Sequence, residues 1–175
     1  MWSEEKCQEY VLEKIKVWFD THYEDFSNCK VDSKFDSTEN QIKCMIIYIK
    51  HLLNKKYGYN LPINYSVNTK LYHAIKETFV LNTDEKDRLD YLYIIQAILR
   101  IRGYKCDFCG TLTDFTKKAL IQAEQDTQSS FIYHRRYTYG AHTLIYLLCD
   151  GFNWSGSKSC YKEIEKERKI VQCLK

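Results

Sequence analysis

Apolar residues recur every three or four positions through most of the first hundred residues, which is the spacing of one face of a helix. The first such segment covers residues 3–22, with Glu4 in an early turn, where the helix dipole favours acids. The second begins at Thr38, with Gln41 three residues on in the spacing of a capping box, and we expect it to end at Gly58. A chain with this pattern must bury several helix faces against one another.

Two further helices complete this region. Asn68 or Thr69 can cap the third helix, and a capping pattern at Asn82 begins the fourth. Gly103 stands where the fourth helix is expected to stop. Because residues 91–99 are apolar on almost every side, we expect the fourth helix to be the central element of a bundle.

The chain changes character after Gly103, because YKCDFCG at residues 104–110 holds a Cys-x2-Cys turn closed by glycine. Residues 113–125 then fit a short helix. Its inward side chains are predicted to be Phe115, Ala119 and either Ile121 or Leu120.

Two strands and a terminal helix are predicted for the remainder. Residues 131–138 and 142–148 flank a Tyr-Gly turn and favour a β-hairpin by composition, and residues 161–174 fit a charged helix. The expected fold class is α+β, mainly α. It consists of a helical domain over residues 1–103 and a zinc-stabilised module over residues 104–175.

The composition indicates a folded chain, and the sequence limits the cellular compartments in which it is expected. Only 6 Gly and 1 Pro among 175 residues, with 45% hydrophobic and 15% aromatic residues, argue against a disordered or collagen-like chain. The longest apolar runs, residues 45–49 and 144–149, are far too short to cross a bilayer. The acidic start of the sequence does not resemble a secretory signal. We therefore expect a protein that is not secreted and that resides in a reducing compartment.

Four of the eight cysteines follow the spacing Cys106-x2-Cys109-x39-Cys149-x10-Cys160. In a reducing compartment such a set favours metal ligation over disulfides. A Cys-x2-Cys turn lets two thiolates point at one centre, and Gly110 permits the tight backbone that the turn needs. Four thiolates would close a tetrahedral structural site for one zinc ion.

Three alternatives to this ligand set remain open. His134, His142 or Cys173 can replace the less certain ligands. Cys149 can instead be a small buried side chain. The Cys-x2-Cys pair can also be a redox pair, although a helix and a glycine before it fit such a pair poorly.

A basic and aromatic segment, FIYHRRYTYGAH, lies between the two cysteine pairs. As a strand it would turn Tyr133, Arg135, Tyr137 and Tyr139 to one face and Arg136 to the other. Such a face can stack bases and contact phosphate. The alternative is that the tyrosines cover the zinc core while the arginines are solvated. The net charge of +3 does not by itself predict nucleic-acid binding, so a contact must depend on this local segment.

The segments CDFCG and SGSKSCYKEI resemble the FCS-type zinc finger of the viral late transcription factor 2 family, found in poxviruses and the African swine fever virus group. In that family the pattern is Cys-x2-Cys, a spacer, and a further pair of cysteines leading into a helix. The resemblance implies that Cys106, Cys109 and Cys160 are zinc ligands. It also places Ser157 and Lys158 on the family's Ser-Lys step, which makes Lys158 a candidate contact for nucleic acid or another ligand.

This chain departs from the family pattern at one ligand. Gly156 stands where the family has its third cysteine. Cys149 must then supply the missing thiolate from upstream, or the site has three cysteines and a histidine.

The resemblance implies a virus-encoded zinc-binding factor for late gene expression, acting in the viral factories of the host cytoplasm or in the nucleus. We expect a non-enzymatic protein that binds nucleic acid, viral transcription proteins or both, and no membrane. The sequence has no Gly-rich phosphate loop, no GxSxG and no HExxH. The alternative is a virus-encoded interaction protein that binds a host innate-signalling component or an anionic nucleotide ligand. A zinc-supported nuclease is the remaining enzymatic alternative.

Overall fold

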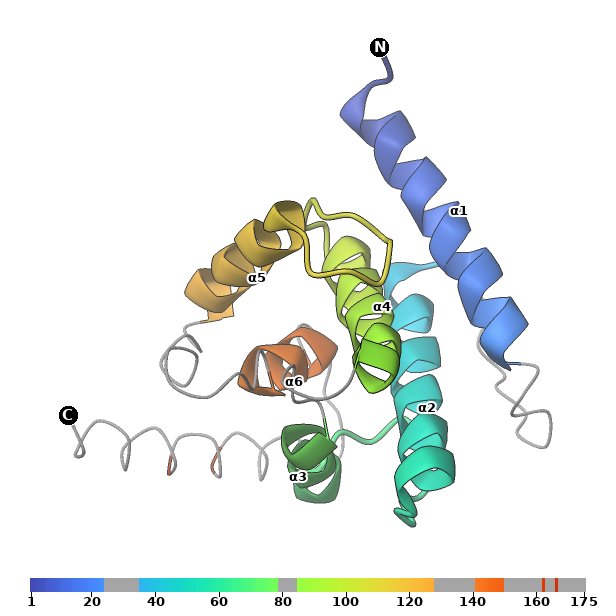
Figure 1. Ribbon diagram of the computed structural model, residues 1–175, viewed down its shortest axis with the longest axis vertical. Helices are drawn as coiled ribbons and strands as arrows, with labels where there is room; N and C mark the ends of the chain where they lie inside the picture. The colour runs from blue at the N-terminus through green and yellow to red at the C-terminus, as the bar shows by residue number, and fades with distance from the viewer. Residues whose placement is uncertain (24–34, 79–84, 128–140, 150–161, 163–165, 167–175) are drawn as a thin grey trace.

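The computed structural model describes residues 1–23, 35–78, 85–127 and 141–149, together with Lys162 and Lys166, and these segments form helices and their connections (Figure 1). The helices are α1 (Glu4–Tyr23), α2 (Thr38–Tyr57), α3 (Thr69–Thr78), α4 (Glu85–Ile101), α5 (Asp114–Thr127) and α6 (Ala141–Cys149). The described ranges contain no β-strand. The mainly helical expectation is therefore confirmed, while the α+β fold class is wrong for the part of the chain that the structure describes.

Local capping groups set the ends of α2 and α3. Ser37 Oγ, one residue before the predicted cap, accepts a hydrogen bond from Asn40 N at 3.2 Å, and Gly58 follows α2 with a φ of 72°. Asn68 Oδ1 accepts a hydrogen bond from Leu71 N at 3.0 Å at the start of α3. These helices form where the sequence predicts them because their caps satisfy backbone groups that helix ends leave unpaired.

The predicted β-hairpin is the main error of the sequence prediction. Its second strand, residues 142–148, is part of α6, and its first strand, residues 131–138, lies outside the described residues. The buried aliphatic side chains of α6 are Leu144, Ile145, Leu147 and Leu148. A continuous apolar run of this kind fits a buried strand and a buried helix equally well. Here the run packs against α3, α4 and α5 and forms a helix.

The predicted terminal helix over residues 161–174 lies almost entirely outside the described residues. The structure describes only Lys162 and Lys166 in it, and both are helical.

Helix α4 is the central element, as its apolar sequence predicts. It packs against α1, α2, α5 and α6 (Figure 1). From Tyr91 to Leu99 every side chain is buried except Tyr93, which is half-buried. The hydrophobic cluster around it extends from Ile15 in α1 to Cys149 in α6, so residues on both sides of the change in sequence character share one core.

Helix α5 turns inward Ala119 and Leu120, as predicted, but not Phe115. Ala119, Leu120 and Ala123 are buried, whereas Phe115 is 63% exposed and Ile121 is 48% exposed. The prediction that Phe115 faces inward is wrong. Ala119, Leu120 and Ala123 belong to the core cluster, and α5 packs against α4 and α6.

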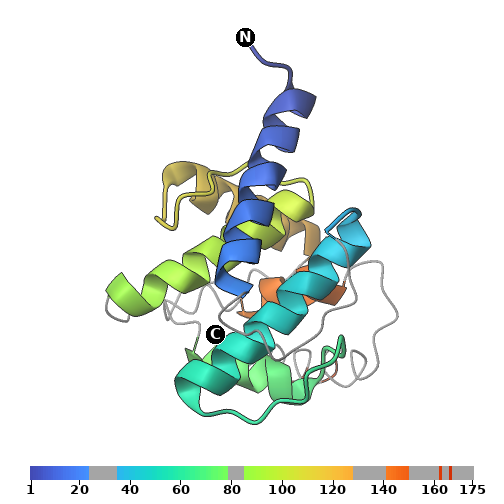
Figure 2. The ribbon, with the colours of Figure 1, turned by 90° about the vertical axis from the view of Figure 1, so that its right-hand side faces the viewer.

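Helix α1 buries side chains in the core through its C-terminal half. Ile15, Trp18 and Phe19 belong to the core, while Trp2 and Tyr10 are about half exposed. Figure 2 shows the N-terminal half of α1 projecting beyond the other helices. No helix within the described ranges combines the length and apolar character that crossing a membrane requires.

Lys50 is a buried cation that holds the connection between α2 and α3. Its side chain is only 1% exposed. Lys50 Nζ donates hydrogen bonds to Asn64 O at 2.8 Å, Asn64 Oδ1 at 2.7 Å and Ser66 O at 2.6 Å. Burial lowers the pKa of Lys50 from 10.5 to about 8.

We expect the free energy of unfolding to contain a Lys50 contribution that rises with pH between about 8 and 10.5. The folded chain has the lower pKa, so the unfolded chain binds more protons in this window and stability increases with pH. Relative to Lys50→Met, the native chain should gain on the order of 1–2 kcal/mol between about pH 7.5 and 9.5. Urea unfolding of both proteins at both pH values measures this difference. Subtracting the two results cancels the contributions of thiols and tyrosines, which are common to both proteins. Identical pH dependence in the two proteins would contradict the prediction.

Candidate metal centre

The Cys106–Cys109 turn follows α4 directly and folds back along that helix. Tyr104 N donates to Leu99 O at 2.9 Å, which ends the helix and reverses the chain. Cys106 is 1% exposed, and its Sγ donates to Gln96 O at 3.6 Å. Cys109 is exposed, and its Sγ donates to Thr111 O at 3.6 Å. The turn therefore carries one buried thiol against the helix and one thiol open to solvent.

The side chain of Gln96, fully buried in the middle of α4, holds this turn. Its Oε1 accepts hydrogen bonds from Cys109 N and Gly110 N, both at 2.9 Å. Its Nε2 donates to Thr111 O and Thr116 Oγ1, both at 2.9 Å, and lies 3.7 Å from Cys109 Sγ. All four hydrogen-bonding positions of the carboxamide are thus used. One side chain fixes the backbone on both sides of the exposed thiol.

Glycine is the only residue type that fits at position 110, at the end of this turn. Its φ is 71°, in the left-handed region. A Cβ at this position would lie 2.5 Å from Cε2 of Tyr93, so the turn is pressed directly onto the tyrosine ring. The glycine therefore meets both a backbone and a packing requirement.

Arg100 connects the turn to α1. Its Nε donates to Cys106 O at 2.7 Å, and its Nη1 donates to Gln8 Oε1 at 2.8 Å. Gln8 Nε2 donates in return to Arg100 O at 2.7 Å. Lys105 also pairs with Glu4 on α1, but both side chains are well exposed and such pairs contribute little.

Aromatic side chains of the neighbouring helices pack against the turn. Phe108 lies inside the Cys-x2-Cys motif, and its ring packs edge-on against Tyr93 and Trp18, with centroid distances of 5.1 and 5.7 Å. Trp18 also stacks on Tyr93 at 5.7 Å and contacts Tyr48 at 5.0 Å. The turn thus sits on a cluster contributed by α1, α2 and α4.

Burial raises the pKa of the Cys106 thiol to about 12, although the nearby Arg100 guanidinium opposes this rise. A metal ion would have to displace the proton of this thiol, since cysteine ligates as a thiolate.

The structure brings only two of the four predicted zinc ligands together. Cys106 and Cys109 share one turn, while Cys149 lies at the end of α6 and is 3% exposed. Within the described residues, no group of three or more His, Cys, Asp or Glu side chains is placed to hold a metal ion. Cys149 is therefore not brought to the pair. Cys160 lies outside the described residues.

Two of the alternative ligands, His134 and Cys173, lie outside the described residues. The backbone of the third, His142, belongs to the first turn of α6. The described residues thus bring together two candidate sulfur ligands, which fit the preference of structural zinc sites for thiolates. A complete site would need two more ligands from residues 128–140 or 150–175.

The predicted contacts for nucleic acid or another ligand all lie outside the described residues. They are Tyr133, Arg135, Arg136, Tyr137, Tyr139 and Lys158.

The sequence prediction missed the two residues that hold the turn in place. Gln96 is the only residue between 91 and 99 that is neither aliphatic nor aromatic, and this was the available signal. A lone amide in a buried helix must find hydrogen-bond partners. Arg100 carried no such signal, because a basic residue in the last turn of a helix is ordinary.

Comparison of the chain with family models, curated proteins and solved structures gives no match.

Proposed function

We propose that this chain is a non-enzymatic zinc-binding protein that acts by binding nucleic acid, transcription proteins or both. The observation that carries the proposal is the Cys106–Cys109 turn held by Gln96. Metal sites depend on surrounding hydrogen bonds that fix the ligands before the metal arrives. Here the amide N–H groups of Cys109 and Gly110 are fixed by Gln96 Oε1 at 2.9 Å, and Cys109 Sγ is open to solvent.

The zinc site in this proposal is completed by Cys160, which the resemblance to the late transcription factor 2 family assigns as a ligand. The fourth ligand comes from His134 or Cys173, the alternatives that lie within residues 128–140 and 150–175. A site of this kind has no open position for water and serves a structural role. It would join the C-terminal region of the chain to the end of α4.

The nucleic-acid part of the proposal is supported by sequence. Arg135 and Arg136 are flanked by tyrosines between the two cysteine pairs, a composition suited to phosphate contact and base stacking. The same resemblance points to a virus-encoded factor for late gene expression.

We expect purified native protein to contain one zinc ion per chain, measured by elemental analysis. Cys106→Ser, Cys109→Ser and Cys160→Ser should each lose most of it, since a tetrahedral site that loses a thiolate loses affinity sharply. Cys149→Ser should keep its zinc, because Cys149 is not placed with the pair.

Cys7→Ser is the matched control, because Cys7 is an exposed cysteine on α1 that forms no group of candidate metal ligands with the pair among the described residues. Native protein free of zinc after purification without chelator would end the zinc proposal. Equal zinc loss in Cys7→Ser would mean that the metal binds thiols without a defined site.

A further inference from the structure

The helical part of the chain carries a lysine-rich surface at the end of the molecule opposite the start of α1. Residues 50–78 contain five lysines and one acid, a formal charge of +4, whereas the whole chain carries +3. The remaining residues together are therefore slightly acidic, and α1 alone has five acids and three lysines. Positive charge is concentrated on α2, α3 and their connection.

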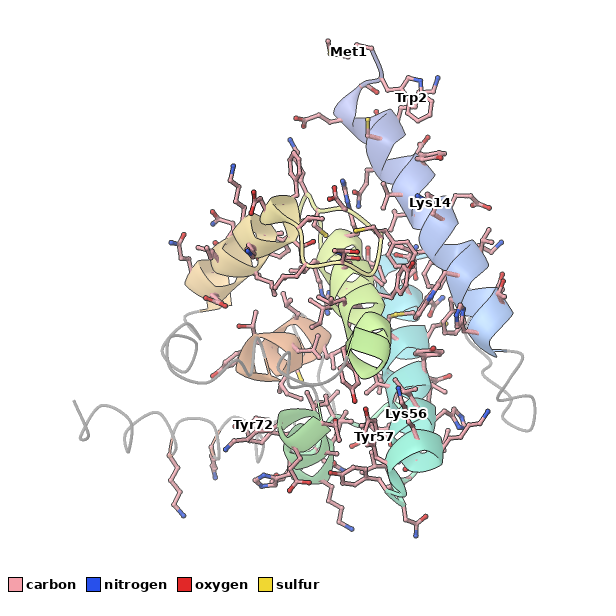
Figure 3. The ribbon with its side chains drawn as sticks, in the orientation of Figure 1. Met1, Trp2, Lys14, Lys56, Tyr57 and Tyr72 are labelled. Atoms are coloured by element: carbon pink, nitrogen blue, oxygen red, sulfur yellow. The ribbon has the colours of Figure 1, made fainter. Side chains whose placement is uncertain are left out.

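Four of these lysines define the surface, which we call the lysine surface. They are Lys55, Lys56, Lys70 and Lys76. Figure 3 shows Lys56 and Tyr57 at the end of α2 and Tyr72 on the neighbouring α3, far from Met1 and Trp2. The fifth lysine, Lys50, is buried and does not contribute.

Side-chain contacts link the parts of α2 and α3 that carry three of these lysines. The Tyr59 hydroxyl, just after α2, donates to Glu77 at the end of α3, which joins the Lys55–Lys56 turn to the turn that holds Lys76. That bond also occupies the only acidic side chain of the segment. Lys56 Nζ lies 5.8 Å from the centroid of the Tyr57 ring, and Lys76 Nζ lies 5.8 Å from that of Tyr72. The ammonium groups are thereby held near the surface instead of sampling all directions.

Lys70 stands in an unfavourable place unless an anion is near. It lies in the first turn of α3, where the helix dipole disfavours cations, and that turn has no acidic residue. Lys55 and Lys56, by contrast, lie in the last turn of α2, where cations are favoured. The positive charge of Lys70 is therefore not stabilised by the dipole of its own helix, unlike the charges of Lys55 and Lys56.

The chemistry of this surface fits a phosphate backbone better than a protein or a membrane. Residues 50–78 contain no arginine, whereas protein interfaces are enriched in arginine and depleted in lysine. Ile63 is the only large hydrophobic residue of these described residues that is exposed, so an apolar anchor for a bilayer is missing. Lysine is a point charge suited to sequence-independent phosphate contact.

We propose that the lysine surface binds the phosphate backbone of nucleic acid independently of base sequence. This inference rests on the proposed nucleic-acid partner but not on the zinc site. It assigns the helical domain a direct contact with nucleic acid, in addition to the contact proposed for Arg135 and Arg136. The lysine surface would supply affinity and the arginine-tyrosine segment would supply base contacts.

The test is binding of the full chain to a fluorescent duplex oligonucleotide across a series of salt concentrations. The variant replaces Lys55, Lys56, Lys70 and Lys76 with glutamine. The control replaces four exposed lysines elsewhere, Lys14, Lys16, Lys117 and Lys118, so both proteins lose the same charge. We expect the variant to lose about tenfold or more in affinity at low salt, and its salt slope to fall by about 0.9 for each phosphate that it no longer neutralises. The control should lose much less.

Several results would overturn the proposal. They are no binding by the native chain at low salt, equal losses in variant and control, and unchanged affinity in the variant. Equally tight binding to poly-glutamate or to phosphatidylserine vesicles would assign the surface to a different partner. Should the four-lysine variant unfold, the double variant Lys55→Gln with Lys70→Gln repeats the test with one exposed lysine changed on each helix.

The same assay separates this proposal from the proposed function. Arg135→Ala with Arg136→Ala and the zinc content of the native protein test the zinc module alone. Loss of binding in the arginine variant with full binding in the lysine variant would reject only the lysine surface. The reverse result would support the lysine surface and reject the arginine-tyrosine contact.

Discussion

Replacing Gln96 with methionine is expected to lower the free energy of unfolding by about 3–5 kcal/mol, since buried donors and acceptors left unsatisfied cost about 1–3 kcal/mol each. Methionine keeps the length of the side chain and removes its polar atoms. Cys109 N, Gly110 N, Thr111 O and Thr116 Oγ1 then lose bonds of 2.9 Å. Urea unfolding followed by circular dichroism measures the change.

Gln122→Met is the matched control for this substitution. Gln122 is exposed on α5, and its side chain donates one hydrogen bond, to Asp126 at 2.9 Å. This variant should change stability by less than about 0.5 kcal/mol. Similar effects of the two substitutions would show that the Gln96 network does not hold the turn.

Gly110→Ala is expected to cost about 2–4 kcal/mol of stability. A left-handed backbone costs about 1–2 kcal/mol for a residue with a Cβ, and overpacking adds about 1–3 kcal/mol. The clash is with the Tyr93 ring, whose Cε2 would lie 2.5 Å from the new methyl group. The measurement is again the midpoint and slope of urea unfolding.

Gly58→Ala separates the two causes. Gly58 has a φ of 72°, almost the same as Gly110, but a Cβ there meets nothing within 4 Å. It should therefore cost only the backbone term of about 1–2 kcal/mol. Equal losses at Gly58 and Gly110 would show that the Tyr93 contact adds nothing to the cost of the substitution.

The sequence predicts those features of the fold that neighbouring residues determine. The ends of α2 and α3 were predictable because Ser37, Gly58 and Asn68 act on backbone groups a few residues away. The central place of α4 followed from its continuous apolar surface, which leaves no face for solvent. The Cys-x2-Cys motif likewise predicted that Cys106 and Cys109 share one turn.

Features that depend on distant parts of the chain were not predictable in this way. Helix α6 has an apolar run that suits a strand as well as a helix, and only its contacts with α3, α4 and α5 decide between them. The rotation of α5, which exposes Phe115, is set by neighbouring helices too. Gln96 could be recognised as an unusual residue, but its partners could not be named, because they lie in a turn that follows the helix.

The link between Arg100 and Gln8 bears on the order in which the chain acquires its structure. These residues are 92 positions apart, and the Lys105–Glu4 pair spans 101 positions. Closing so long a loop is entropically costly, so such contacts form late in folding. On a ribosome, the N-terminal half of the first helix would emerge early and make these two contacts only after the fourth helix had been synthesised. The cysteine pair is consequently positioned by a nearly finished fold, and a metal ion would be captured at the end of folding instead of starting it.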